Sequence, residues 1–316
     1  MGEKSRKIGE IGENIAENFF SLIGWYQLPE AQTIPCVKPT KHARPESKKG
    51  KRETHGIDFL HCYKSPLESN TVESIIISVK HTDDAYKTNP KETFKAHALD
   101  LAQTLECYKN SELKASQLAN FKGVTRNRDT GVLFWISSND QTYDDVISKI
   151  ANSRLDADLK FETLHVVDNK TLSFIFETMT WLGNHFQGRE VEFYYPETAL
   201  SYIDKSISRS GHLMPVEFLT SPILPFLIKD PRGVDKDTFC FSAADDFDQD
   251  TLRRLIQASR EYTHEIACDY LYLFPNFVES HHADAVSKAQ MGFDRRISTR
   301  ISVKSFQPDF RSLNRG

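Results

Sequence analysis

The strongest constraint on the fold is a predicted strand at positions 73–81 that contains a near-continuous β-branched run, formed by Ile75, Ile76, Ile77 and Val79. A strand with one face in water would alternate apolar and polar residues. An unbroken β-branched run is instead typical of a central strand that is covered on both faces. The run therefore predicts a sheet that lies between layers of helix, as in α/β proteins.

The segments around this strand predict an α/β domain with a mixed sheet. Apolar residues at helical spacing from Ile8 to Leu22 predict a first helix, which Gly24 ends. A second amphipathic helix is expected after Asn89 and Pro90, which have the form of an N-cap and a first-turn proline. The other elements expected in the first 182 residues are strands at 33–37, 56–63, 131–137 and 162–167 and helices at 142–151 and 171–182.

A chain of 316 residues is long enough for one large or two ordinary domains. Because the pattern of elements breaks around residues 183–189, we expect a larger domain at 1–185 and a smaller α/β domain at 186–316. The elements expected in the smaller domain are strands at 191–195, 238–242, 270–274 and 297–302 and a helix at 251–263. Its acidic bias suits an interface with a partner protein or a second copy better than a second active site.

Composition narrows the possible functions. The chain carries 40 Lys+Arg and 44 Asp+Glu, so any contact with phosphate must come from local clusters. Its apolar runs are too short to cross a bilayer and no charged leader opens it, so we expect a cytoplasmic protein without membrane contact. The five cysteines are scattered without a CxxC pair, which indicates reduced thiols and excludes a zinc ribbon.

Two neighbouring strands carry a pair of residues with a definite chemical use. Asp58 lies on the first strand and Lys80 on the next. A carboxylate can bind Mg²⁺ through oxygen, and the metal acidifies a water and offsets the charge of a phosphate. A lysine beside it can orient or deprotonate that water. The pair therefore indicates hydrolysis of a phosphodiester.

The order and spacing of three segments resemble the PD-(D/E)XK nuclease superfamily. They are a Gly-Glu helix start from Gly9 to Glu13, the strand sequence Gly56-Ile-Asp58, and an apolar strand that ends at Lys80. The likeness is to members related to Holliday-junction resolvases and YraN-type proteins, and implies a restriction-endonuclease-like core in the order αβββαβ. The opening and the long C-terminal region also resemble the nuclease subunit of two-gene anti-phage defence systems. The resemblance makes Glu13, Asp58 and Lys80 the catalytic candidates, together with Ser78 at the position of the motif's acid.

The sequence departs from the superfamily pattern at one position. The acidic residue two places before the lysine is replaced by Ser78, a poor ligand for Mg²⁺. The missing charge is expected to come from Glu13 or Glu17, one helical turn apart, and the carbonyl of Val79 is a further candidate ligand. We therefore expect a weak metal site that accepts Mg²⁺ and tolerates Mn²⁺.

A basic segment at 38–52 leads into the strand of Asp58, where a DNA backbone would have to lie. A run of this kind is either solvated surface or a salt-sensitive phosphate contact. The candidates for DNA binding are Lys48, Lys49, Lys51, Arg52 and His81. His81 follows Lys80 and is expected on the opposite face of the strand, so it suits packing or a peripheral phosphate contact rather than a base.

These observations predict a metal-dependent DNA nuclease that works within a complex in anti-phage defence. Two alternatives stay open. The first is a catalytically silent subunit that keeps the fold to bind DNA or a partner protein, which the replacement of the acid by Ser78 favours. The second is a homodimeric enzyme that resolves Holliday junctions.

Overall fold

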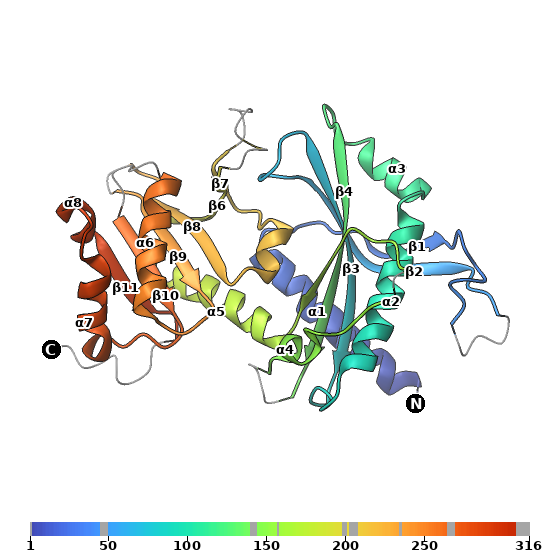
Figure 1. Cartoon of the computed structure of the whole chain (residues 1–316). Helices are drawn as coiled ribbons and strands as arrows, with labels where there is room; N and C mark the ends of the chain where they lie inside the picture. Colours follow the sequence, from blue (N-terminus) through green and yellow to red (C-terminus); the bar gives the residue numbers. More distant parts are fainter. Residues whose placement is uncertain are drawn as a thin grey trace. The chain divides into compact units, whose positions relative to one another are not determined.

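The computed structural model describes residues 2–44, 50–139, 144–156, 158–197, 201, 208–233, 236–263 and 269–307. The chain divides into two compact units, Met1–Ser173 and Phe174–Gly316, each with its own mixed sheet (Figure 1). The division falls within helix α5 (Asn169–His185), earlier in the chain than the boundary expected at residue 185.

The first unit has the order αβββαβ that the resemblance implied, with the two short helices α3 and α4 and a fifth strand added. The sheet runs β1-β2-β3-β4-β5, in which β2 is antiparallel to both β1 and β3, and β4 is parallel to both β3 and β5. The restriction-endonuclease-like α/β core is therefore confirmed. Its elements are α1 (Gly2–Leu22), β1 (Glu30–Pro35), β2 (Thr54–Lys64), β3 (Thr71–Thr82), α2 (Lys91–Tyr108), α3 (Glu112–Leu118), β4 (Arg126–Ser137), α4 (Val146–Ile150) and β5 (Thr163–Val167).

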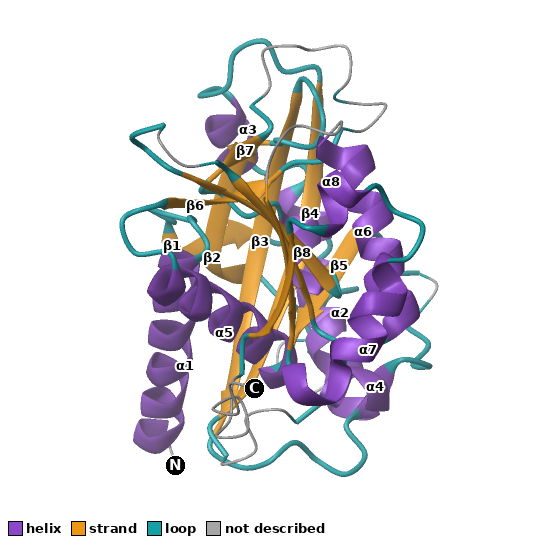
Figure 2. Cartoon of the chain, turned by 90° about the vertical axis from the view of Figure 1, so that its left-hand side faces the viewer, coloured by secondary structure: helices purple, strands orange, loops and turns teal. Residues whose placement is uncertain are grey.

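Strand β3 is the central strand that its isoleucines predicted, and it is covered on both faces. Helix α1 packs on one face, where Phe20 contacts Phe59 of β2 edge to face. Helix α2 packs on the other face, where Leu101 and Leu105 lie against Gly131 of β4. The two helices are seen on either side of the sheet in Figure 2. Because side chains alternate along a strand, successive residues of β3 face α1 and α2 in turn.

One glycine sets how closely α1 approaches the sheet. A Cβ atom at Gly12 would lie 2.4 Å from Cβ of His81 and 3.5 Å from Cγ1 of Val79. The Gly-Glu opening of the helix therefore has a packing reason, since any side chain at this position would push α1 away from β3. The same contacts show that Val79 and His81 face α1, so Ser78 and Lys80 face α2.

The second unit is built on the sheet β11-β10-β9-β8-β6-β7, which is parallel from β9 to β11 and antiparallel elsewhere. Helices α6 and α7 cover one face of this sheet. On the other face, Thr178 of α5 lies within hydrogen-bonding distance, 2.8 Å, of Ser242 of β9. The elements after α5 are β6 (Glu190–Tyr194), β7 (Ser210–Gly211), η1 (Val216–Thr220), β8 (Ile223–Lys229), β9 (Thr238–Ala243), α6 (Gln249–Thr263), β10 (Asp269–Phe274), α7 (Glu279–Gln290), α8 (Arg295–Ser298) and β11 (Ile301–Ser305).

The structure corrects two of the predicted elements. The strand expected at 297–302 is wrong in its first part, because Asp294 caps the short helix α8 and the strand begins only at Ile301. The helix expected at 142–151 is confined, in its described part, to α4, which Asp145 caps. Helices α3 and α7 and strand β8 were not predicted; α7 buries only Ala289, and Pro225 interrupts the strand pattern of β8.

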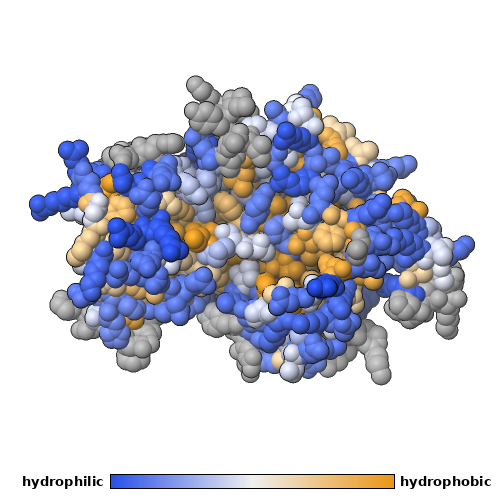
Figure 3. Space-filling view, in the orientation of Figure 1, coloured by the Kyte–Doolittle hydropathy of each residue, from blue (hydrophilic) through white to orange (hydrophobic). Residues whose placement is uncertain are grey.

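No helix in the described part of the chain is long and apolar enough to span a bilayer. Hydrophilic residues dominate the face seen in Figure 3. The few exposed large apolar side chains include Ile11 and Ile15 of α1, each 39% exposed, and Phe176 of α5, 55% exposed.

Candidate active site

Three of the predicted catalytic residues line one cavity of the first unit. The cavity has a volume of about 130 Å³ and lies between β2 and β3 on one side and α2 on the other. Asp58, Ser78 and Lys80 all contribute to its wall. The polar residues that join them are Arg44, Arg52, Asp100 and Thr104.

Asp58 is oriented by the backbone of β3. Phe59 pairs with Ile77, so Asp58 lies beside the second half of β3. The N–H of Val79 donates a hydrogen bond of 2.7 Å to Oδ2 of Asp58. Among the described residues, Oδ1 has no hydrogen-bond partner. The strand pairing therefore fixes the carboxylate and leaves one of its oxygens available to a ligand.

Lys80 brings a positive charge to the same cavity without an ion pair. Its side chain makes no hydrogen bond or salt bridge with any residue in the described part of the chain. The charge of Lys80 nevertheless affects the pKa of a neighbouring histidine. The pKa of His97 on α2 falls to about 4, chiefly because the ring is buried and also because Lys80 lies near it. Lys80 is therefore a cation in the cavity wall that no ion pair within the described residues engages.

A carboxylate that sequence reasoning missed, Asp100 of α2, lies in the wall of the cavity. Its Oδ1 accepts a hydrogen bond of 2.5 Å from Nη1 of Arg52 and is 3.5 Å from Nη2 of Arg44. Burial alone would raise the pKa of Asp100, but the hydrogen bond and charge of Arg52 hold it below its ordinary value. The cavity wall thus contains a second acidic residue besides Asp58. The only signal for it in the sequence is its place beside Leu101, at the edge of the apolar stripe of α2.

The structure separates the two helix glutamates from the cavity wall. Glu13 and Glu17 are exposed on α1, on the face of the sheet opposite to α2. Glu13 is near enough for its charge to interact with Asp58 and Lys80. Its pKa is raised, first by burial and then by the negative charge of Asp58, although Lys80 lowers it. Glu13 therefore lies near the cavity without lining it, whereas Asp58 and Asp100 are the acids in its wall.

The predicted DNA-binding residues have different surroundings. Lys48 and Lys49 lie outside the described residues, and Lys51 is exposed. Arg52 is not a solvated cation, because its side chain is only 10% exposed and pairs with Asp100. His81 does not line the cavity: its Nδ1 donates to the carbonyl of Ile8 at 2.7 Å, and its Nε2 lies 2.6 Å from Oγ of Ser138.

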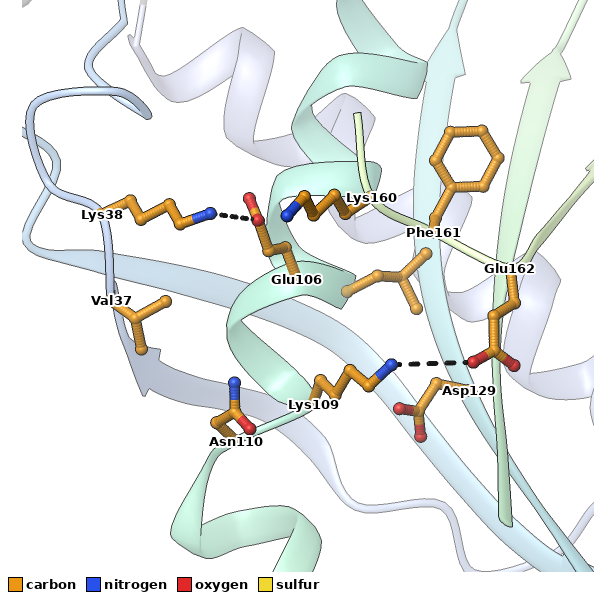
Figure 4. Close-up of a pocket in the computed structure, with 10 residues that line it drawn as sticks. Val37, Lys38, Glu106, Lys109, Asn110, Asp129, Lys160, Phe161 and Glu162 are labelled. Atoms are coloured by element: carbon orange, nitrogen blue, oxygen red, sulfur yellow. Dashed lines mark hydrogen bonds and ion pairs between the residues drawn. The ribbon is translucent and has the colours of Figure 1, made fainter. Parts of the chain in front are cut away.

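A second cavity of the first unit, of about 380 Å³, lies near the C-terminal end of α2 (Figure 4). Its charges are largely satisfied within the protein: Nζ of Lys38 donates to Glu106 at 2.5 Å, and Lys109 lies 3.8 Å from Glu162. None of the residues predicted for catalysis lines it. The smaller cavity around Asp58 is therefore the candidate active site.

Comparison with known proteins gives one match. The family model described as the PD-(D/E)XK nuclease domain of the GAPS4 protein matches residues 1–171. No curated protein and no solved structure matches the chain. The match covers more than half of the chain and includes β2, β3 and α2, which carry Asp58, Lys80 and Asp100. The superfamily resemblance is thereby confirmed, and the chain belongs to the GAPS4 PD-(D/E)XK nuclease domain family.

Proposed function

We propose that the chain is a metal-dependent deoxyribonuclease that hydrolyses DNA phosphodiesters at the cavity of Asp58, Lys80 and Asp100. The observation that carries this proposal is that two carboxylates and a lysine line one polar cavity, and that the lysine has no ion-pair partner among the described residues. Family membership supports nuclease chemistry. The requirement for metal and the choice of DNA are our inferences from the cavity.

The oxygen atoms around the cavity suit Mg²⁺ or Mn²⁺. Oδ1 of Asp58 and the carboxylate of Asp100 are hard, charged ligands of the kind these ions prefer. The carbonyl of Val79 is a further candidate, since the N–H and C=O of a strand residue point to the same edge and this N–H already reaches Asp58. A bound ion there would acidify a water molecule and neutralise charge on the phosphate.

In this scheme, three residues of the cavity wall have separate roles. Asp58 is held by Val79 in the orientation that binding requires. Lys80 can orient or deprotonate the attacking water and offset the negative charge of the phosphate. Ser78 is a neutral and therefore weaker neighbour than the usual acid, so we expect a low affinity for Mg²⁺ and good activity with Mn²⁺.

Arg52 links metal binding to DNA binding in our proposal. In the structure, it neutralises Asp100 through a hydrogen bond of 2.5 Å. A cation that takes over Asp100 would release the guanidinium group, which is well suited to a phosphate because it offers several fixed N–H donors. We therefore expect metal and DNA to bind cooperatively.

The direct test is cleavage of linear, circular and four-way-junction DNA with Mg²⁺ or Mn²⁺ by the purified full chain, together with any protein encoded beside it. We expect the wild-type chain to cleave DNA and the variants Asp58→Asn and Lys80→Met to show no cleavage. The matched controls are Asp284→Asn, an exposed residue of α7, and Lys64→Met, at the far end of β2. Cleavage that survives both cavity variants would overturn the assignment.

A catalytically silent subunit is the second candidate. It is favoured by Ser78 in place of the acid and by the engagement of Asp100 with Arg52. In that case DNA would bind without metal and would stay intact with every divalent ion. We further propose that the second unit serves as an interface for a partner protein or a second copy in anti-phage defence, which co-purification and size measurements test.

A further inference from the structure

Four buried side chains outside the candidate active site meet at one point of the first unit. They are Cys36, His42, His55 and Cys107, and their ligand atoms all lie within 4.8 Å of one another. Cys36 directly follows β1, His42 lies in the connection to β2, His55 is the second residue of β2, and Cys107 is the second-last residue of α2. Residues from three separate elements thus converge on one site.

The distances between these atoms fit a tetrahedral zinc site. Nδ1 of His42 lies 3.3 Å from Sγ of Cys36, 3.5 Å from Sγ of Cys107 and 3.3 Å from Nε2 of His55. The two sulfur atoms are 4.0 Å apart. A tetrahedron with ordinary Zn–S and Zn–N bonds has edges of roughly 3.8 Å between sulfurs, 3.6 Å from sulfur to nitrogen and 3.3 Å between nitrogens. The sulfurs are also too far apart for a disulfide.

Hydrogen bonding alone does not account for the geometry around His42. Its Nδ1 faces three partners at close range. A ring nitrogen has either one proton or one lone pair, so it can satisfy only one of them well. A cation at the centre would accept all four ligand atoms at once.

The outward-facing atoms of the two histidines already have partners. Nε2 of His42 is 3.0 Å from Oε2 of Glu106, and Nδ1 of His55 is 3.3 Å from Oγ1 of Thr104. In addition, the N–H of Val37 donates to Sγ of Cys107 at 3.4 Å. Metal-binding histidines typically have their second nitrogen held in this way by a carboxylate or another oxygen, which fixes the orientation of the ring.

We propose that Cys36, His42, His55 and Cys107 bind one structural zinc ion. Thiolate and imidazole ligands suit zinc, whereas Mg²⁺ prefers oxygen, so this site is chemically distinct from the carboxylate cavity. Four protein ligands fill the tetrahedral coordination and leave no position for a substrate. Burial of all four side chains agrees with a structural role.

The ion would attach residues 36–55 to helix α2. This connection carries Arg44 and Arg52, and α2 carries Asp100, which pairs with both. The zinc site would therefore hold the arginine-bearing segment against one wall of the cavity. In this respect the inference deepens the proposed function, while zinc binding itself does not depend on nuclease activity.

The first test is the metal content of the full chain, purified without chelators and incubated with one equivalent of Zn²⁺. Mass spectrometry should find one zinc ion per chain, and Asp58→Asn should retain it. The double variant Cys36→Ser with Cys107→Ser should lose the zinc. Cys62→Ser is the matched control, since Cys62 is a free thiol outside the cluster. Wild-type protein without zinc, or a double variant with its full zinc content, would overturn the proposal.

The second test gives a readout of the ligands even if the double variant folds poorly. Wild-type chain loaded with Co²⁺ in place of zinc should show the visible absorption of tetrahedral cobalt and the sulfur-to-cobalt charge-transfer band, as should Cys62→Ser. A wild-type chain without these bands would refute thiolate ligation. Zinc in Asp58→Asn without any nuclease activity in the wild type would leave this inference intact while refuting the proposed function.

Discussion

Arg52 donates a hydrogen bond of 2.5 Å to Asp100 and so joins the segment before β2 to helix α2 in the wall of the candidate active site. The pair brings a cation and an anion to a cavity that also contains Asp58 and Lys80. With Arg44, the cavity wall holds three basic side chains and two acidic ones.

Replacement of Asp58 by Asn should abolish DNA cleavage with little effect on stability. Asn keeps an oxygen that can accept the N–H of Val79, but it lacks the charge that a metal requires. We expect a loss of at least about 100-fold in cleavage rate, comparable to the loss of one strong electrostatic contact in other active sites. The rate and the melting temperature should be measured beside Asp284→Asn, which should match the wild type in both.

Replacement of Lys80 by Met should also abolish cleavage, but it should leave the melting temperature unchanged or raise it. The substitution removes a partly buried charge without an ion pair among the described residues and keeps the long aliphatic stem. Lys80→Arg, which keeps the charge in a different shape, separates electrostatic from proton-transfer roles. Rapid cleavage by Lys80→Met would show that this lysine takes no part in the reaction.

The Arg52–Asp100 pair should contribute to stability and DNA binding together. Arg52→Met leaves Asp100 without its closest partner, which should cost about 1–3 kcal/mol in the free energy of unfolding. DNA affinity should fall, and its dependence on salt concentration should weaken. Urea unfolding and binding titrations of Arg52→Met, Asp100→Asn and the double variant measure the coupling. Additive effects would show that the two side chains act independently.

Two glycines of α1 should respond to alanine in opposite ways. At Gly12 the added Cβ meets Cβ of His81 at 2.4 Å, so α1 must move, and we expect a loss of about 1–3 kcal/mol in unfolding free energy. A Cβ atom added at Gly9 would meet no atom within 4 Å beyond its own stretch of the helix, so alanine should stabilise the helix by about 0.5–1 kcal/mol. Thermal or urea unfolding compares the two. Equal effects would contradict the packing of α1 against β3.

Acid should weaken the first unit partly through Glu68. Burial raises the pKa of this carboxyl, but hydrogen bonds and charge from Arg126 and Arg128 outweigh burial and lower it below 4.5. A lowered pKa means that the ionised form stabilises the fold above pH 4.5, and this contribution is lost as the pH falls through the folded-state pKa. Glu68→Gln should therefore be less stable than the wild type at neutral pH, and the difference should shrink as the pH is lowered below 4.5. A difference that does not change with pH would refute this role.

Much of the first unit could be predicted from local patterns. The isoleucine run identified β3 as a central strand, and the apolar spacing identified α1 and α2. The alternation of side chains along β3 placed Lys80 and His81 on opposite faces. These predictions succeeded because the strand and helix periods depend only on neighbouring residues.

The residues that were missed come from separate elements. Asp100 lies on α2, and nothing in its neighbourhood in the sequence distinguishes it from any other helix acid; only the packing of α2 on β2 and β3 brings it to Asp58. Glu13, which was expected to supply the charge that Ser78 lacks, lies on α1, on the opposite side of the sheet from α2. A sequence motif gives the order of residues along the chain. It does not indicate which helix brings a second carboxylate to the cavity when the motif's acid is replaced, as it is here by Ser78.

By itself, the sequence determined most of the elements of the first unit, its central strand and the places of Asp58 and Lys80 on two neighbouring strands, because these features follow from local hydrophobic periodicity. Only the tertiary structure decided that Asp100 completes the cavity and that Cys36, His42, His55 and Cys107 meet. Those contacts depend on strand register and on the position of α2 over the sheet. Both are consequences of packing the whole core, which no short stretch of the sequence specifies.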